Sequence, residues 1–162
     1  MYGNDVVYLT FMSKEEVLDL NVKPSSVHSF PVKENKILAT FNKRGFDIIG
    51  GHIEGNETAV DTLMRECHEE AYIIPLKYDL IGAIRVDNRD NDLTKYPRIG
   101  YQFFYVVSEY KELDFKSEFE CESKHLLSKN EFKLKHHNWL FVHQKLLDIA
   151  TKDFKVKKKL KP

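Results

Sequence analysis

The segment 51–73 constrains the fold of this chain of 162 residues more than any other part of the sequence. A glycine pair, Gly50-Gly51, precedes a stretch in which apolar residues recur with the 3.6-residue period of a helix. The apolar positions are Val60, Leu63, Met64, Cys67 and Ala71. The sequence therefore predicts a tight glycine turn that leads into an amphipathic helix with one face in a core.

A different face of the predicted helix carries acidic side chains. A helix turns by about 100° per residue, so positions three and four apart share a face, and Glu66, Glu69 and Glu70 form such a set. Glu57 falls near the start of the helix, where negative charge offsets the helix dipole. Carboxylates this close repel one another unless cations are bound. The pattern therefore predicts a metal site and metal-assisted chemistry on an anionic substrate.

The same segment resembles the motif of the Nudix hydrolases, which consists of Gly, five residues, Glu, seven residues and then Arg-Glu-apolar-any-Glu-Glu-any-Gly-apolar. Eight of the nine specified positions match in register, namely Gly51, Glu57, Arg65, Glu66, Cys67, Glu69, Glu70 and Ile73. The late glycine of the family is replaced by Tyr72. We therefore expect the backbone at this end of the helix to differ from that of the family.

An ordinary surface helix rich in glutamate is the competing explanation. It accounts for Glu69 and Glu70, but it does not account for Gly51, Glu57 and Arg65 at the spacing of the motif. We therefore interpret the segment as a functional site.

The resemblance implies a fold of the α/β class, an α/β/α sandwich with a mixed β-sheet and a loop-helix-loop catalytic motif. It also implies Mg²⁺-dependent hydrolysis of a pyrophosphate bond in a substrate that contains a nucleoside diphosphate. Mg²⁺ is favoured over Zn²⁺ because the expected ligands are all oxygen atoms, and Mn²⁺ is a feasible substitute.

By match to the family, the expected metal ligands are the carbonyl of Gly51 and the carboxylates of Glu66, Glu69 and Glu70. Either Glu66 or Glu70 is the candidate general base, and the sequence does not choose between them. Arg65 is expected to orient the carboxylates, through Glu57, rather than to contact substrate.

Many members of the family add a carboxylate from outside the motif, near a late strand. The segment 118–122 alternates acidic and apolar residues, which places its acidic side chains on one face of a strand. Glu120 is our first choice for the additional metal ligand and Glu122 our second. A solvent-facing edge strand explains the alternation equally well.

The sequence contains few features that indicate the substrate. The tyrosine or proline that dinucleoside-polyphosphate and ADP-ribose subgroups place downstream of the motif is absent from 87–91. By elimination we favour a nucleoside triphosphate pyrophosphatase, such as one for an oxidised guanine nucleotide. An ADP-ribose or nucleotide-sugar pyrophosphatase is the alternative. A non-catalytic, nucleotide-binding regulatory Nudix module is a further alternative, against which the intact acidic cluster argues.

Length and composition limit the number of domains, the class of substrate and the cellular location that we expect. Length favours a single Nudix domain at 1–154, followed by a basic tail at 155–162. The 25 basic and 25 acidic residues balance, so we expect a small nucleotide substrate rather than nucleic acid. No apolar run is long enough to span a membrane, and two cysteines are too few for a disulfide framework. We expect a cytoplasmic protein without a membrane partner, and a homodimer stays open.

Hydrophobic periodicity and turn residues predict alternating strands and helices. A capping box at Ser13 and Glu16 predicts a short helix that ends near Leu20. We predict strands at 6–11, 27–32, 36–41, 46–49, 80–86, 100–107 and 126–127, a loop at 87–97, and a final amphipathic helix at 137–150. The seven histidines show no zinc spacing, so we expect them at the surface or at helix ends, and Trp139 in the core.

Overall fold

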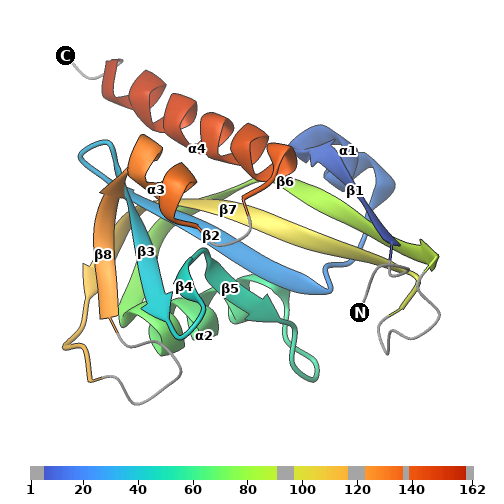
Figure 1. The fold of residues 1–162 in the computed structure, drawn as a ribbon, viewed down its shortest axis with the longest axis horizontal. Coiled ribbons are helices and arrows are strands. Elements are labelled where there is room, and N and C mark those ends of the chain that lie inside the picture. The colour runs from blue at the N-terminus through green and yellow to red at the C-terminus, as the bar shows by residue number, and fades with distance from the viewer. Residues whose placement is uncertain (1–5, 91–96, 117–122, 137–138, 160–162) are drawn as a thin grey trace.

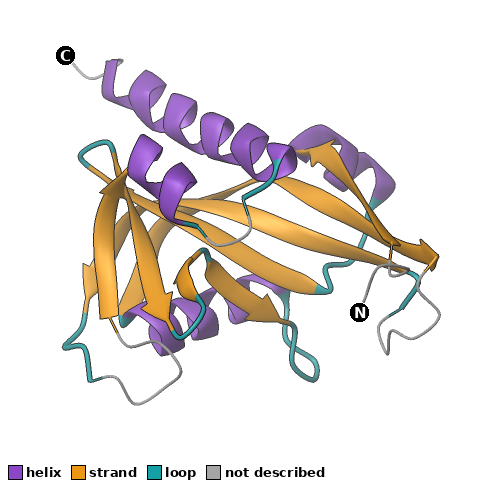
Figure 2. Cartoon of the chain, in the orientation of Figure 1, coloured by secondary structure: helices purple, strands orange, loops and turns teal. Residues whose placement is uncertain are grey.

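The computed structural model describes residues 6–90, 97–116, 123–136 and 139–159, with the backbone alone at 6, 90 and 152–159. Its elements, in chain order, are β1 (Val6–Ser13), α1 (Lys14–Leu20), β2 (Ser26–Lys33), β3 (Lys36–Asn42), β4 (Gly45–Asp47), β5 (Ile49–His52), α2 (Ala59–Ala71), β6 (Ile73–Asp90), β7 (Ile99–Glu112), β8 (Ser123–Ser128), α3 (Lys129–Lys135) and α4 (Phe141–Lys159). Helices cover both faces of the sheet, with α3 and α4 on one face and α2 on the other (Figures 1 and 2). The predicted α/β/α sandwich is confirmed.

The sheet is mixed and divides at β2. Its strand order is β1-β6-β7-β2-β3-β4, while β5 pairs with β2 and β8 pairs with β3. Residues 26–31 of β2 run parallel to β7, and the β2 residues Val32 and Lys33 pair with β3 in the antiparallel sense. In Figure 1, β3 and β8 run steeply across the direction of β2 and β7, so the two parts of the sheet diverge from β2.

Each face of the sheet has its own apolar core. On the face covered by α3 and α4, Phe30, Phe104 and Leu146 belong to one buried cluster. On the opposite face, Leu63 and Cys67 of α2 pack in a second cluster. The predicted apolar stripe of the motif helix is therefore the surface by which α2 attaches to the sheet, and this attachment leaves its acidic face directed elsewhere.

Capping boxes define where three helices begin. The predicted box at Ser13 and Glu16 opens α1, and the same reciprocal bonds join Thr58 to Asp61 at the start of α2. A third box, at Ser128, opens α3. Each box satisfies two backbone N–H groups that the first turn of a helix leaves unpaired. Within the part of the chain that the structure describes, no helix has the length and apolarity needed to cross a membrane.

Several predicted boundaries were wrong, and β6, β7 and β8 are longer than the strands predicted at 80–86, 100–107 and 126–127. The loop expected at 87–97 is wrong for residues 87–90, which belong to β6, because Asp87 stays in register with Ile99 of β7 and with Tyr8 of β1. Residues 91–96 lie outside the described residues. The carboxylate of Asp87 is 1% exposed and accepts a hydrogen bond from the guanidinium of Arg89 at 2.5 Å. A charged partner makes this burial tolerable, which an alternation pattern does not reveal.

The end of the chain also differs from the expectation. Helix α3 was not predicted, and α4 begins at Phe141 rather than 137 and continues to Lys159, into the basic segment 155–162. Trp139 precedes α4 and packs against the core, as expected, with its indole N–H donating to Gln144 at 3.0 Å.

Tyr72 ends α2 in the left-handed conformation, with φ 52° and ψ 47°. Glycine commonly takes this conformation after a helix, because it has no Cβ to clash. The expected departure of the backbone from a glycine-type helix end is therefore not found. Tyr72 is 5% exposed, its ring centroid lies 5.0 Å from that of Phe115, and its carbonyl accepts the N–H of Leu113 at 2.8 Å.

We expect Tyr72→Gly to destabilise the protein even though it restores the residue of the family. Glycine relieves about 1–2 kcal/mol of left-handed strain, but loss of a buried aromatic ring costs roughly 3–5 kcal/mol. Urea denaturation of both proteins measures the difference, and Tyr72→Phe, which keeps the ring, is the matched control. A Tyr72→Gly protein more stable than the parent would contradict this account.

Candidate active site

Two glycines bring the backbone of β5 into contact with side chains on both sides. A Cβ atom at Gly50 would lie 2.3 Å from Nδ1 of His28, and one at Gly51 would lie 2.2 Å from Oε1 of Glu66. Both distances are far shorter than van der Waals contact allows, and neither neighbour is free to move without disturbing the site. The tight turn predicted at Gly50-Gly51 is not found, because both glycines lie in β5 and pair with His28 and Val27 of β2. Glycine serves here for close approach rather than for a turn.

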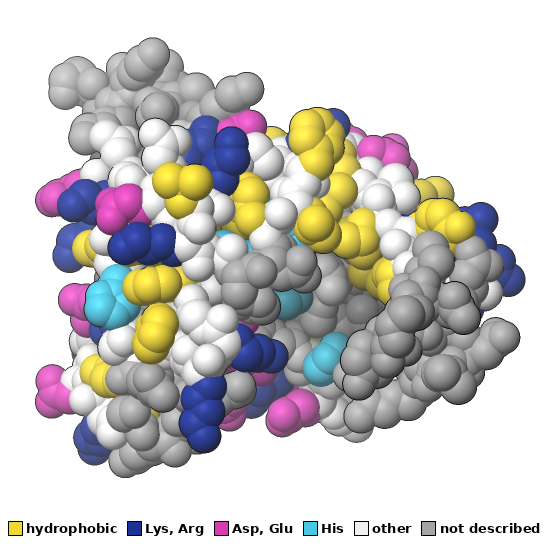
Figure 3. Space-filling view, in the orientation of Figure 1, with side chains coloured by type: hydrophobic (Ala, Val, Ile, Leu, Met, Phe, Trp, Pro, Cys, Tyr) yellow, Lys and Arg dark blue, Asp and Glu magenta, His cyan; other side chains and the backbone are white. Residues whose placement is uncertain are grey.

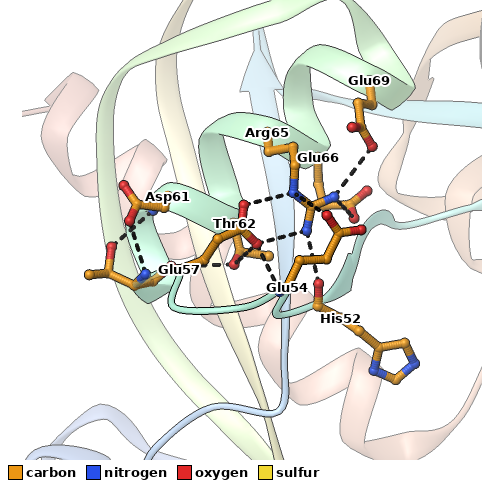
Figure 4. Close-up of polar contacts among 9 residues, drawn as sticks. His52, Glu54, Glu57, Asp61, Thr62, Arg65, Glu66 and Glu69 are labelled. Atoms are coloured by element: carbon orange, nitrogen blue, oxygen red, sulfur yellow. Dashed lines mark hydrogen bonds and ion pairs between the residues drawn. The ribbon is translucent and has the colours of Figure 1, made fainter.

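Arg65 lies at the centre of the acidic cluster (Figure 4). Its Nε and Nη2 atoms donate to the two carboxylate oxygens of Glu57 at 2.8 and 3.0 Å, and Nη1 donates to Glu66 at 2.8 Å and to Glu69 at 3.3 Å. Nη2 also donates to the carbonyl of His52 at 2.9 Å. One guanidinium therefore ties the start of α2, its acidic face and β5 together, because its planar fork has several donors.

The electrostatics of the cluster differ from one carboxylate to the next. Hydrogen bonds from Arg65 are the main cause that lowers the pKa of Glu57 to about 2. Burial raises the pKa of Glu66, against the opposing effect of Arg65. The hydrogen bond to Glu57 raises the pKa of Arg65 above its ordinary value, so the guanidinium stays charged. Glu57 is thus a permanent anion, whereas Glu66 is the more basic carboxylate.

Arg65 holds two of the three glutamates of the acidic face, and the third bonds to the backbone of β5. Glu70 accepts the backbone N–H of Gly50 at 3.0 Å, while Glu66 and Glu69 share Arg65. Among the residues that the structure describes, no three acidic, histidine or cysteine side chains converge closely enough to form a ready-made metal cage. The donors near Gly51 are nevertheless all oxygen atoms, a set that suits Mg²⁺. Glu120 and Glu122 lie outside the described residues, so their predicted role stays a prediction.

The acidic face forms one wall of a cavity of about 670 Å³. Part of this region is seen in Figure 3, where histidine, basic and acidic side chains border a hollow in the face shown. The lining residues are His28, Arg44, Asp47, Ile48, Gly50, Gly51, His52, Glu54, Arg65, Glu66, Glu69, Glu70, Gln102, Phe104, His136 and His143. A cavity of this size matches the usual volume of a small-molecule site.

Histidines form another part of the cavity lining. His28 corrects the expectation that the histidines lie at the surface or at helix ends, whereas His136, the C-cap of α3, and His143, in the first turn of α4, do lie at helix ends. His28 is partly buried on β2 and stacks on Phe104 of β7, with ring centroids 5.0 Å apart. His136 and His143 flank the start of α4, with ring centroids 5.9 Å apart. The fold gathers these rings from strands and helices distant in sequence, so their spacing along the chain held no such signal.

Asp47 holds this histidine wall to β4. Its Oδ1 accepts the N–H of Ile48 at 2.9 Å and lies 3.1 Å from Nε2 of His136, and its Oδ2 lies 3.5 Å from the guanidinium of Arg44. A backbone bridge between Phe46 and His136 reinforces the attachment. The segment after α3 is therefore fixed to β4, the strand that precedes the glycines of β5.

Burial lowers the pKa of both His28 and His143 to about 4. For His143 the neighbouring His136 acts in the same direction, and for both rings Asp47 acts in the opposite one. Both imidazoles are therefore neutral at pH 7. Burial also raises the pKa of Cys67 to about 12, so its thiol, which faces Ser29, stays protonated and belongs to the core.

Sequence reasoning missed the second wall. His28 and Gln102 are polar residues beside apolar neighbours in β2 and β7, and Asp47 ends the short strand β4, which were the available signals. A single polar residue in a strand is more often a satisfied core group than part of a site, so the signal was weak.

The lowered pKa values of His28 and His143 predict how the free energy of unfolding depends on pH. The unfolded chain, with histidine pKa values near 6.5, binds more protons than the folded chain between about pH 6.5 and 4. The free energy of unfolding should therefore fall as the pH falls from 7.5 to 5.5, as urea denaturation would measure. His28→Phe should flatten this dependence, and exposed His125→Gln should not. If the free energy of unfolding changed equally with pH in all three proteins, the lowered pKa of His28 would be refuted.

Comparison with known proteins gives the following matches. The NUDIX domain profile matches residues 23–148. No curated protein matches the chain. Among solved structures, the chain is similar to a variant of the Bacillus subtilis pyrophosphohydrolase BsRppH, with 20% identity, coverage of 96% of this chain and 94% of that chain, and a TM-score of 0.66.

Two further structures are similar over most of their length. The MutT NUDIX hydrolase from Burkholderia pseudomallei has 15% identity, coverage of 80% and 99%, and a TM-score of 0.58. The NUDIX domain of Shewanella oneidensis NrtR, in a complex with ADP ribose, has 13% identity, coverage of 88% and 99%, and a TM-score of 0.54. At such identities these structures show a shared fold alone. Because the domain profile covers more than half of the sequence, the chain belongs to the NUDIX domain family.

Proposed function

We propose that this chain is a divalent-metal-dependent hydrolase that cleaves a phosphoric anhydride bond in a substrate containing a nucleoside diphosphate. The observation that carries the proposal is the cavity wall made by Gly51, Glu66, Glu69 and Glu70, with Arg65 holding two of the three carboxylates. A wall with this many acidic groups is suited to cations that in turn bind phosphate oxygens.

The residues that would hold Mg²⁺ are the carbonyl of Gly51 and the carboxylates of Glu66, Glu69 and Glu70. Bound Mg²⁺ would neutralise phosphate oxygens and make a water molecule more acidic. The chain itself supplies the positions. Gly51 leaves the space that brings Glu66 close to β5, and the N–H of Gly50 orients Glu70.

Arg65 and Glu57 would act as positioning residues. Glu57 engages Nε and Nη2 of Arg65, which leaves Nη1 directed at Glu66 and Glu69. The general base is either Glu66, whose pKa burial raises, or Glu70, and both alternatives stay open.

For the substrate, we favour a nucleoside triphosphate, such as an oxidised guanine nucleotide. A cavity of about 670 Å³ with an acidic wall and a neutral imidazole wall offers one region for phosphates and another for a base. ADP-ribose or a nucleotide sugar is the alternative, since the NrtR domain was crystallised with ADP ribose. The regulatory, non-catalytic alternative predicts binding without turnover.

We also expect a cytoplasmic protein, and the possibility of a homodimer stays open.

Turnover of a substrate panel tests the proposal. With Mg²⁺ or Mn²⁺, the protein should hydrolyse one class among nucleoside triphosphates, oxidised nucleotides, ADP-ribose, nucleotide sugars and dinucleoside polyphosphates, as product chromatography would show. Glu66→Gln and Glu70→Gln should each lower kcat by about a hundredfold or more, and exposed Glu109→Gln should not. Tight nucleotide binding without any turnover would support the regulatory alternative instead.

The positioning role of Arg65 has its own test. Lysine keeps the charge of Arg65 but lacks its planar fork, so Arg65→Lys should raise the Mg²⁺ concentration for half-maximal turnover by about tenfold or more. Titration of turnover with Mg²⁺ measures this. Arg85→Lys, in the separate cluster around Asp87, is the matched control. The same Mg²⁺ concentration for half-maximal turnover in both variants would contradict the positioning role of Arg65.

A further inference from the structure

Gln102 of β7 lines the cavity with a partly buried side chain that ends in a carboxamide. Within the described part of the chain, no residue forms a hydrogen bond with this carboxamide. The polar side chains beside it on β2 satisfy each other, since Oγ of Ser26 and Nε2 of His28 lie 3.1 Å apart. A carboxamide has two N–H donors and an acceptor oxygen. Gln102 therefore offers the cavity a donor and an acceptor next to each other.

The pleat of β7 determines the face of the sheet on which Gln102 lies. Side chains two positions apart on a strand share a face, and β7 keeps an unbroken register with β2 here, so Gln102 shares the face of Phe104. Phe104 belongs to the buried cluster beneath α3 and α4, whereas α2, which carries the glutamates, packs on the opposite face. The carboxamide and the acidic helix therefore reach the cavity from opposite faces of the sheet.

The strand order separates Gln102 from Gly51, the proposed metal ligand on β5. Ser26 of β2 pairs with Gln102 on one side and with His52 of β5 on the other. Neighbouring strands are about 4.8 Å apart, so β5 and β7 lie roughly 10 Å apart across β2. A ligand that contacts both a metal ion at Gly51 and the amide of Gln102 must be extended, as a nucleotide is from its phosphates to its base.

The base is the part of a nucleotide that best matches a neutral amide. A phosphate presents acceptor oxygens alone, so it would use only the N–H groups of Gln102, and it would gain no charge compensation. The edge of a base presents a donor next to an acceptor, and a glutamine side chain forms two hydrogen bonds with such an edge. A few directed polar groups among aromatic rings are typical of small-molecule sites. His28 and Phe104, whose ring centroids lie 5.0 Å apart, supply such rings beside Gln102.

We propose that Gln102 is a substrate-binding residue whose carboxamide forms two hydrogen bonds with the edge of the substrate base. This inference rests on the proposed function and deepens it, since it assigns the group that holds the base. Rotation of the amide exchanges its donor and its acceptor, so Gln102 selects for the presence of a base rather than for one particular base. Loss of a two-bond contact of this kind corresponds to about a tenfold or larger loss of affinity.

A ribonucleoside triphosphate and ribose 5-triphosphate form a matched pair for the test, because the second lacks only the base. Calorimetry on the full chain, with Ca²⁺ in place of Mg²⁺ to limit turnover, measures dissociation constants for ribose 5-triphosphate and for the tightest bound of the four ribonucleoside triphosphates. Gln102→Met keeps the length of the side chain but lacks the amide. It should weaken binding of the nucleotide about tenfold or more and leave that of ribose 5-triphosphate unchanged. Exposed Lys111→Met, on the same strand, should change neither.

These measurements separate the inference from the proposed function, because they require no hydrolysis. A loss of nucleotide affinity in Gln102→Met that ribose 5-triphosphate does not share supports the inference even when no nucleotide is turned over, in which case only the proposed function fails. Equal weakening of both ligands would place the amide at the ribose or the phosphates and overturn the inference. Unchanged nucleotide affinity in Gln102→Met would also overturn it, as would a parent protein that binds neither ligand.

Discussion

The contacts of Arg65 are the interaction on which the site depends. Glutamates at 57, 66 and 69 would repel one another if they faced the same space with no cation between them. The guanidinium compensates them through bonds of 2.8–3.3 Å, and its remaining contact with the carbonyl of His52 joins α2 to β5. Because a guanidinium keeps its charge at every ordinary pH, the acidic wall retains one arrangement.

The glycine pair connects the two walls of the cavity. Gly50 contacts the ring of His28 on one side and gives its N–H to Glu70 on the other, so a single backbone position contacts both the histidine wall and the acidic wall. Asp47, a few residues earlier, anchors His136. Any residue larger than glycine at position 50 would have to displace His28 or the backbone of Val27.

Local features were predictable because their causes are local. The capping box at Ser13, the apolar stripe of α2 and the strands predicted at 27–32 and 36–41 depend on residues a few positions apart, and the structure contains all of them. The extent of β6 was not predictable, because a buried Asp87 is tolerated only through Arg89 and neighbouring arginines. Helix α3 was missed because Phe132 is its one buried residue, which leaves too little periodicity to detect.

The sequence by itself determined the acidic half of the site. Arg65, Glu66, Glu69 and Glu70 lie in α2, where helical geometry places them together, and Gly51 of β5 and Glu57 precede this helix by a few residues. Only the tertiary structure decided the other half. His28, Asp47, Gln102 and His143 come from β2, β4, β7 and α4, and they meet because β2 runs parallel to β7 while α4 packs over the same face. Contacts between residues so distant in sequence depend on sheet order and helix packing, which no local spacing encodes.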